Sequence, residues 1–211
     1  MKPLIVIGAG GFGREALDAV DASNRVAARW QVLGVVDDAP SALALERLAA
    51  RGVAHLGGIA QCSEFAQGTA YVIGVGAPQA RARIDRTLHE LGHRPATVVH
   101  PAAVIGSNVE IGEGTVICGG VQVSTNVRLG RHVHLNPNAT IGHDAVLHDF
   151  VCVNPGAIVS GEVHVHDRSL VGAGAVILQG LSVGADAVVG AAACVTRDVD
   201  AGRTVKGVPA R

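Results

Sequence analysis

The sequence has very few of the large side chains that fill most protein cores. It contains three Phe, one Tyr, one Trp and one Met among 211 residues. Glycine is abundant, with 28 residues, and 48% of the chain is apolar, which excludes a disordered protein. A core made almost entirely from Val, Ala, Leu and Ile must be narrow and regular. This composition directs the search to internal repeats.

Other absences exclude whole classes of function. The 17 basic and 18 acidic residues are interspersed, so no basic surface for nucleic acid or anionic lipid is indicated. No apolar run approaches the roughly 18 residues of a membrane span, and the start MKPLIVIGAGGFGRE turns glycine-rich too early for a signal peptide. The four cysteines are far apart and form no CxxC motif, which favours reduced thiols. We therefore expect a cytoplasmic protein that binds neither nucleic acid nor membranes.

The second half of the chain is a repeat with a period of six. From Val99 to Asp200 it divides into seventeen hexads, each beginning with Val, Ile or Leu and holding Val, Ala, Thr, Ser or Leu at the fifth place. An α-helix cannot keep every sixth residue on one face, whereas a solenoid with three flat sides can. The pattern predicts a left-handed parallel β-helix with three hexads per coil, turns at places two to four, and 201–211 as a cap.

Residues 1–95 follow another pattern, in which apolar runs alternate with helical segments. Strands are predicted at 4–10, 30–38 and 70–76, and helices at 11–22 and from Pro78 to 92. Such alternation is typical of a small parallel α/β sheet. The sequence thus predicts two domains, an α/β domain over 1–95 and a β-helix over 96–211.

A glycine motif lies between the first strand and the first helix. Gly8, Gly10 and Gly13 form GxGxxG, which lets backbone N–H groups approach phosphate oxygens. Asp37 or Asp38 at the end of the second strand can accept from ribose hydroxyls or a base N–H. Because the domain is about half the size of a dinucleotide fold, a mononucleotide or nucleotide sugar is favoured over NAD. The alternative is that the glycines only permit tight helix packing.

The combination of GAGGFG, VVDD, IGHDAVLHDF and a terminal KGVPAR resembles the sialic acid O-acetyltransferase and bacterial sugar N-acetyltransferase family over essentially the whole chain. The resemblance implies a homotrimer that binds acetyl-CoA between neighbouring β-helices. It also implies N-acetylation of a UDP- or GDP-linked 4-amino-4,6-dideoxy sugar for bacterial surface glycans such as lipopolysaccharide. An O-acetyltransferase acting on sialic acid or another hydroxyl and a non-catalytic scaffold remain alternatives.

The resemblance places the catalytic base at His143 and the adjacent acid at Asp144. An imidazole can take the proton that an attacking amine loses, and a neighbouring carboxylate can orient the ring. His143 occupies the third place of its hexad and is expected to point outward from a turn. His134 and His148 are also expected to face solvent, and either could be the base instead.

Small residues are the candidates for ligand contacts. Gly10 and Gly76 are candidates for contacts to the nucleotide or are simple turn residues, and the resemblance suggests Asn136 for the sugar or as a plain turn residue. For the pantetheine and phosphate arm of acetyl-CoA, or as simple turn residues required by the fold, it suggests Gly161, Ala173 and Ala191.

Two positions depart from the pattern of the family. Phe12 stands where many relatives have histidine in the glycine motif, and Cys152 stands where some have a histidine that contacts the coenzyme. Contacts to both ligands are therefore expected to depend more on backbone groups.

A metal site is the rival explanation for the many histidines of the repeat. They are spread over consecutive faces without a compact three-ligand spacing, although a trimer axis could gather three copies of one of them. No metal is expected. The histidines concerned are His132, His134, His143, His148, His164 and His166.

Overall fold

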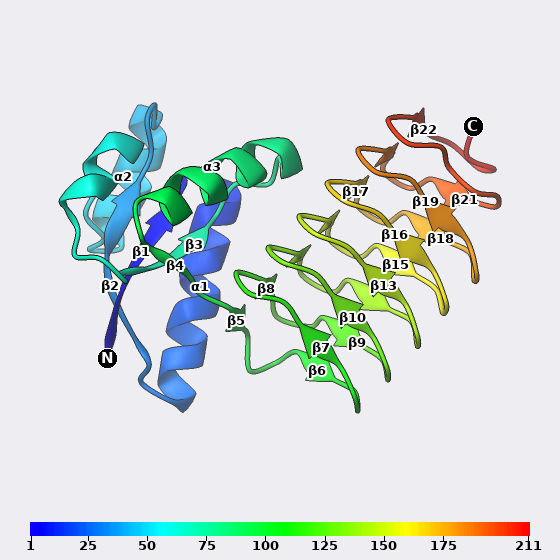
Figure 1. The fold of residues 1–211 in the computed structure, drawn as a ribbon, viewed down its shortest axis with the longest axis horizontal. Coiled ribbons are helices and arrows are strands. Elements are labelled where there is room, and N and C mark those ends of the chain that lie inside the picture. The colour runs from blue at the N-terminus through cyan, green and yellow to red at the C-terminus, as the bar shows by residue number, and fades with distance from the viewer. The chain divides into compact units, whose positions relative to one another are not determined.

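The computed structural model describes residues 1–211 and separates into two compact units, Met1–Val98 and Val99–Arg211. Figure 1 shows a layered sheet with helices in the first unit and a stack of coils in the second. None of the helices combines the length and the apolar character needed to cross a bilayer.

The first unit is built on a four-stranded parallel sheet with the strand order β2-β1-β3-β4. Its strands are β1 (Lys2–Ile7), β2 (Trp30–Val36), β3 (Ala70–Ile73) and β4 (Arg94–Pro95). Its helices are α1 (Gly11–Val26), α2 (Ala42–Ala50), the 3-10 helix η1 (Ile59–Glu64) and α3 (Pro78–Glu90). Since β2 and β3 flank β1 on opposite sides, the carboxyl ends of β1 and β3 form a topological switch point.

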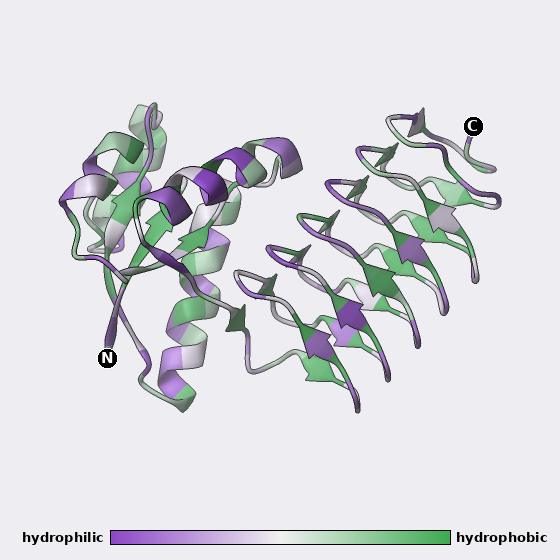
Figure 2. Ribbon diagram, in the orientation of Figure 1, coloured by the Kyte–Doolittle hydropathy of each residue, from purple (hydrophilic) through white to green (hydrophobic).

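Both faces of this sheet are buried. On one face, Ile5 and Tyr71 belong to a core cluster with Leu88 of α3. On the other, Val6 clusters with Leu17 of α1 and with residues of α2. A sheet covered on both faces requires nearly continuous apolar strands, and Figure 2 shows green along much of β1, β2 and β3.

The three main strands and the two long helices were predicted by the sequence, and the structure confirms them. The sequence analysis missed α2, η1 and β4. A local signal for α2 exists, because the Ser41 hydroxyl caps it by accepting a hydrogen bond from Ala44 N at 3.1 Å. The residues that follow, ALALERLAA, are mostly strong helix formers.

The second unit is a parallel β-helix with three sheets of two-residue strands. The seven-stranded sheet contains β5 (Val98–Val99), β8 (Val116–Ile117), β11 (His134–Leu135), β14 (Cys152–Val153), β17 (Leu170–Val171), β20 (Val188–Val189) and β22 (Thr204–Val205). The six-stranded sheet contains β6 (Val104–Ile105), β9 (Gln122–Val123), β12 (Thr140–Ile141), β15 (Ile158–Val159), β18 (Val176–Ile177) and β21 (Cys194–Val195). The five-stranded sheet contains β7 (Glu110–Ile111), β10 (Arg128–Leu129), β13 (Val146–Leu147), β16 (His164–Val165) and β19 (Ser182–Val183).

The hexads take the places that the sequence predicted. Each strand before β22 pairs in parallel with the strand three hexads away, as His134 does with Val116 and Cys152. First-place residues such as Leu135 and fifth-place residues such as Ala139 are fully buried in the interior. The narrow interior therefore explains why the repeat has no large aromatic residue at these places.

Each corner of the β-helix turns at the fourth place of a hexad. Every fourth-place residue from Asn108 to Ala192 has a positive φ, including residues that rarely adopt it, such as Phe150 (61°) and Arg168 (57°). This conformation costs an ordinary L-residue roughly 1–2 kcal/mol, and Gly, Asn and Asp tolerate it best. The repeat imposes it even where the residue type opposes it.

The carboxyl-terminal residues, for which the sequence predicted a cap, first add the strand β22 to the seven-stranded sheet. β22 pairs with β20 so that Thr204 faces Val188, which makes this last coil shorter than the others. Backbone hydrogen bonds then join Cys194 N to Gly207 O at 2.9 Å and Ala210 N to Cys194 O at 2.7 Å. The tail thus supplies partners to the edge strand β21.

Candidate active site

His143 lies at the corner that follows β12, where the sequence predicted an outward side chain. Its Nδ1 is 2.7 Å from Oδ2 of Asp144, and each side chain is 47% exposed. A substrate can therefore reach the ring. With Nδ1–H donating to the carboxylate, the neutral imidazole carries its free electron pair on Nε2, the nitrogen that a proton acceptor would use.

Asp144 is held at both carboxylate oxygens. Oδ2 accepts from His143, and Oδ1 accepts from Asn126 Nδ2 at 3.0 Å. These hydrogen bonds, the one from His143 being the stronger effect, lower the pKa of the Asp144 carboxyl below its usual value. The carboxylate is therefore charged at neutral pH, the state in which it can orient the imidazole.

Gly161 lies beside the His143 ring, one coil further along the chain. A Cβ at Gly161 would come within 2.6 Å of both Cε1 and Nε2 of His143, so any other residue would displace the ring. The backbone adds a contact, because Glu162 N donates to His143 O at 2.8 Å. The structure therefore gives Gly161 a role in seating the proposed base.

The expected position of His134 was wrong. This side chain is fully buried, as are its outward neighbours Val116 and Cys152 in the seven-stranded sheet. The equivalent residues of the five-stranded sheet, such as Glu110 and Arg128, are exposed, and Figure 2 shows β7 and β10 in purple. The hexad register predicts that this side chain points away from the interior. It does not predict whether other residues cover the side chain. A buried His134 cannot be a solvated surface residue.

His148 is half-buried and its ring stacks on His166, with 4.8 Å between the centroids. The ring of His166 in turn has Nε2 3.1 Å from the Ser182 hydroxyl. These rings lie at the corner that follows the five-stranded sheet, not at the corner of His143. No group of three or more His, Cys, Asp or Glu side chains has the geometry of a metal site.

Asn136 is 6% exposed, and its amide nitrogen donates to Val153 O at 2.9 Å. It also lies 3.7 Å from the Cys152 sulfur. Only the side-chain oxygen is left for a ligand. These hydrogen bonds show a structural role for Asn136, and its contact with the sugar remains a prediction.

Ala173 and Ala191 are exposed and lie one coil apart at the corner that follows the seven-stranded sheet. Ala192 N donates to Ala173 O at 2.8 Å, which joins the two turns. The structure thus brings these two alanines together and separates them from Gly161 and His143, which lie at the corner after the six-stranded sheet.

The three glycines of the amino-terminal motif have different roles. Gly8 has a φ of 106°, which favours glycine in this turn. A Cβ on Gly13 would overlap the carbonyl oxygen of Gly8, so Gly13 permits the close approach of α1. Gly10 and Gly76 have open space where a Cβ would lie, and both are exposed. Packing therefore explains Gly13 and leaves Gly10 and Gly76 without a structural explanation.

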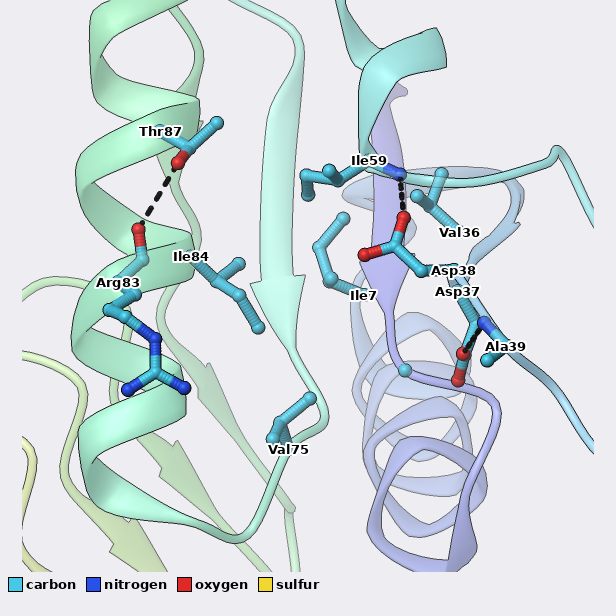
Figure 3. Close-up of a pocket in the computed structure, with 11 residues that line it drawn as sticks. Ile7, Val36, Asp37, Asp38, Ala39, Ile59, Val75, Arg83, Ile84 and Thr87 are labelled. Carbon is cyan, nitrogen blue, oxygen red and sulfur yellow. Dashed lines mark hydrogen bonds between the residues drawn. The ribbon is translucent and has the colours of Figure 1, made fainter.

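A cavity of about 290 Å³ opens at the switch point of the sheet (Figure 3). Its walls include the ends of β1 and β2 with Asp37 and Asp38, and Arg83 lies on α3 across from Asp38. Asp37 is fully engaged, since Oδ2 accepts from Ala9 N at 2.7 Å and Oδ1 from Ala39 N at 3.0 Å. Asp38 uses only Oδ1, which accepts from Ile59 N at 2.7 Å.

The sequence analysis missed several residues that line this cavity. Arg83 and Thr87 of α3 line the cavity four residues apart, a spacing that puts them on one face of a helix. That spacing was the available signal, but polar residues at i and i+4 also occur on any solvated helix face. Ile59 lies in a segment where the sequence predicted no element, and Val75 lies in the predicted strand 70–76 but was not singled out as a site residue.

Comparison with known proteins decides the family. The PglD N-terminal domain matches residues 3–88. WeeI from Acinetobacter baumannii AYE is 32% identical with a TM-score of 0.89, and the match covers 100% of this chain and 99% of WeeI. The chain belongs to the PglD-like family of nucleotide-sugar N-acetyltransferases. As a PglD-like protein it is an acetyl-CoA-dependent sugar N-acetyltransferase, as the resemblance in the sequence implied.

Two further solved structures of PglD-like proteins contain ligands. PerB from Caulobacter crescentus, in complex with CoA and GDP-perosamine, is 26% identical with a TM-score of 0.88, and the match covers 100% of this chain and 97% of PerB. The acetyltransferase domain of PglB from Neisseria gonorrhoeae FA1090, in complex with acetyl coenzyme A, is 27% identical with a TM-score of 0.85, covering 100% and 98%. No curated protein sequence matches the chain significantly.

Proposed function

We propose that the enzyme transfers the acetyl group of acetyl-CoA to the amine of a UDP- or GDP-linked 4-amino-4,6-dideoxy sugar, with His143 as the general base. The observation that carries the proposal is the half-exposed His143 ring, held through Nδ1 by Asp144 at 2.7 Å. PerB, whose structure contains GDP-perosamine, supports a nucleotide-linked amino sugar as the substrate. The product would serve the synthesis of bacterial surface glycans.

The reaction needs one proton to be removed from the attacking nitrogen. Acetyl-CoA supplies an activated acyl group as a thioester. The neutral amine attacks the thioester carbonyl, and Nε2 of His143 accepts the proton that the nitrogen loses. Asp144 keeps the ring oriented and stabilises the imidazolium that forms. The same imidazolium can return the proton to the departing thiolate.

For the nucleotide we assign the cavity of the amino-terminal domain, residues 1–95. Asp38 is a better acceptor for a base N–H or a ribose hydroxyl than Asp37, because its Oδ2 accepts no hydrogen bond in the structure. Gly10 stands at the start of α1, whose first turn carries no acidic residue and has no side-chain cap. Backbone N–H groups at a helix start attract phosphate oxygens, and Gly10 and Gly76 leave room for the diphosphate.

For acetyl-CoA we assign Gly161 together with Ala173 and Ala191 on the β-helix, residues 96–211. Ala173 and Ala191 are exposed, so their small side chains leave the backbone open to the pantetheine arm and the phosphates, whereas Gly161 is buried beside the His143 ring. Gly161 lies beside His143, and the two alanines lie at another corner of the β-helix. A single elongated ligand that contacts all three residues must therefore cross one face of the β-helix or lie between two copies of the chain. Asn136 remains our candidate for a sugar contact, through its side-chain oxygen.

We propose a homotrimer in which neighbouring β-helices complete each acetyl-CoA site. Ile158 and Val176 are outward neighbours on paired strands of the six-stranded sheet, and Leu178 follows them at the corner. Ile158 is 41% and Leu178 is 44% exposed. In a cyclic trimer, each chain would cover the apolar strip of its neighbour, so all three strips would be buried in the same way. We place the reaction in the cytoplasm, where reduced thiols such as the four free cysteines persist.

The test is an acetyl-transfer assay with acetyl-CoA and UDP-, GDP- and dTDP-linked 4-amino-4,6-dideoxy sugars. We expect release of the free thiol of CoA and the mass gain of one acetyl group on one of these sugars. The same sugar with a hydroxyl in place of the amine is the matched control and should not react. Acetylation of that control or of free sialic acid would favour an O-acetyltransferase. Absence of both thiol release and CoA binding would favour a scaffold.

A further inference from the structure

A line of polar side chains runs along the β-helix and ends at the proposed base. Asn108 Nδ2 is 3.3 Å from Asn126 Oδ1, and Asn126 Nδ2 is 3.0 Å from Asp144 Oδ1. Asp144 Oδ2 then accepts from His143 Nδ1 at 2.7 Å. We call these four residues the polar ladder. Its first three members follow one another at intervals of three hexads, so they stack directly from coil to coil.

The backbone explains why these side chains align. Asn108, Asn126 and Asp144 occupy fourth places with φ values of 55°, 58° and 60°, so their Cβ atoms leave successive corners in the same direction. Asn and Asp adopt this conformation more readily than other non-glycine residues. The alignment alone would be a structural feature of the repeat. Its contact with the Asp144–His143 pair gives it a chemical consequence.

The ladder also fixes which end of the Asn126 amide faces Asp144. Asn108 donates to the Asn126 oxygen, so the amide nitrogen is the end that points to the carboxylate. A carboxylate that is 47% exposed would otherwise rotate in water and exchange its oxygens. With Oδ1 held by Asn126, Oδ2 stays directed at Nδ1 of His143.

We propose that Asn126 is a positioning residue of this enzyme, which holds the Asp144 carboxylate in the orientation that aligns His143 for proton transfer. The inference rests on the proposed role of His143 as the base. Asn126 acts only through Asp144, and Asn108 supports it from one coil further away. Nothing in this arrangement requires Asn126 to contact either substrate.

The experiment compares Asn126→Gly with the matched control Asn138→Gly. Asn138 occupies the fourth place of another hexad with a φ of 62°, and it lies at the corner after the seven-stranded sheet. Glycine adopts this φ freely, so both changes remove a side chain without backbone strain. We expect Asn126→Gly to lower kcat roughly tenfold, below the ~100-fold that a 1 Å misplacement can cost. The KM values of both substrates should stay within about twofold, and the control should keep the parent kcat.

A double-mutant cycle with Asp144→Asn separates positioning from a general structural role. If Asn126 acts through Asp144, Asn126→Gly should lower kcat by less than about twofold when Asp144 is already Asn, because the coupled effects do not add. Full additivity, or an equal loss in Asn138→Gly, would overturn the inference. His143→Ala tests the base itself. If that variant keeps its activity, His143 is not the base and this part of the proposed function is wrong. If it loses activity while the cycle is additive, only the positioning role fails.

Discussion

The pair of His143 and Asp144 shows how one turn of the repeat supplies two functional groups. The third place of the hexad points a ring outward, and the fourth place, with its positive φ, turns the next side chain back to the Nδ1 side of that ring. Two adjacent residues on a strand would point to opposite faces. The corner is therefore the place on a β-helix where consecutive residues can form a catalytic pair.

His143→Ala should lower kcat by roughly 10²- to 10⁴-fold and leave the KM for acetyl-CoA nearly unchanged, because the loss falls on proton transfer and not on binding. Asp144→Asn should fall between this variant and the parent, and His148→Ala and His134→Ala should cost much less. Steady-state kinetics with both substrates measure these effects. An activity of His143→Ala within about threefold of the parent, worth under 1 kcal/mol, would rule out this base.

The same variants should differ in their pH dependence. Since the base must be neutral, kcat/KM of the parent should fall on the acidic side as the imidazole gains a proton. Asp144 has a lowered pKa, so it stays ionised across this range and does not produce that limb. The acidic limb should disappear in His143→Ala. In Asp144→Asn it should move to lower pH, because loss of the carboxylate disfavours the imidazolium.

The elements differ in how much the sequence could predict. The β-helix was predictable strand by strand because each hexad repeats one environment, with residues such as Ile141 and Val153 at the same interior place of their hexads. The helix α2 was missed because it is only 9 residues long and, although most of its residues are apolar, only Ala44 and Leu48 are buried. The burial of His134 could not be predicted, since the period describes the interior and not the outer surface of each sheet.

The start of α1 offers a matched pair of glycine variants. Gly13→Ala should lower the stability of the first unit by about 1–3 kcal/mol, since the new methyl group overlaps the Gly8 carbonyl. Gly10→Ala should keep the fold, because Gly10 has an ordinary extended backbone (φ −67°, ψ −170°) and open space around it. It should nevertheless weaken binding of UDP or GDP, whose phosphates need that space.

Thermal unfolding and titration calorimetry with the nucleoside diphosphates measure both variants. If Gly10→Ala binds the nucleotide as tightly as the parent does, the glycine motif serves packing alone. That outcome would remove the diphosphate from the start of α1.

For the whole molecule, the site could be predicted only in part. His143 and Asp144 stood out because they are neighbours in a hexad whose register was known. The choice between Asp37 and Asp38 needed the hydrogen bonds of both carboxylates, and Arg83 needed the placement of α3 beside the cavity. The acetyl-CoA residues lie at two corners, and no pattern within one chain says how one ligand would reach both.

The proposed trimer can be tested through the apolar strip of the six-stranded sheet. Sedimentation velocity at micromolar concentration should give the mass of three chains. Ile158→Glu combined with Val176→Glu should yield monomers and lower the activity, because buried charges disfavour the interface and the composite site is lost. Glu110→Lys, on the outward face of the five-stranded sheet, is the control. A monomeric parent with full activity would contradict the trimer.

The corner residue recurs at the fourth place of each hexad, and this regular spacing limits how such a chain can change its length. A whole coil of three hexads can be added or removed while every remaining strand keeps a partner in the adjacent coil. A single inserted residue would instead shift the register and turn outward side chains towards the interior. The β-helix can therefore lengthen or shorten only by complete coils. Smaller insertions can be accepted only where they form a loop at a corner. The shortened last coil marks where this rule ends, since Thr204 pairs with Val188 before three full hexads have passed and the chain then leaves the prism.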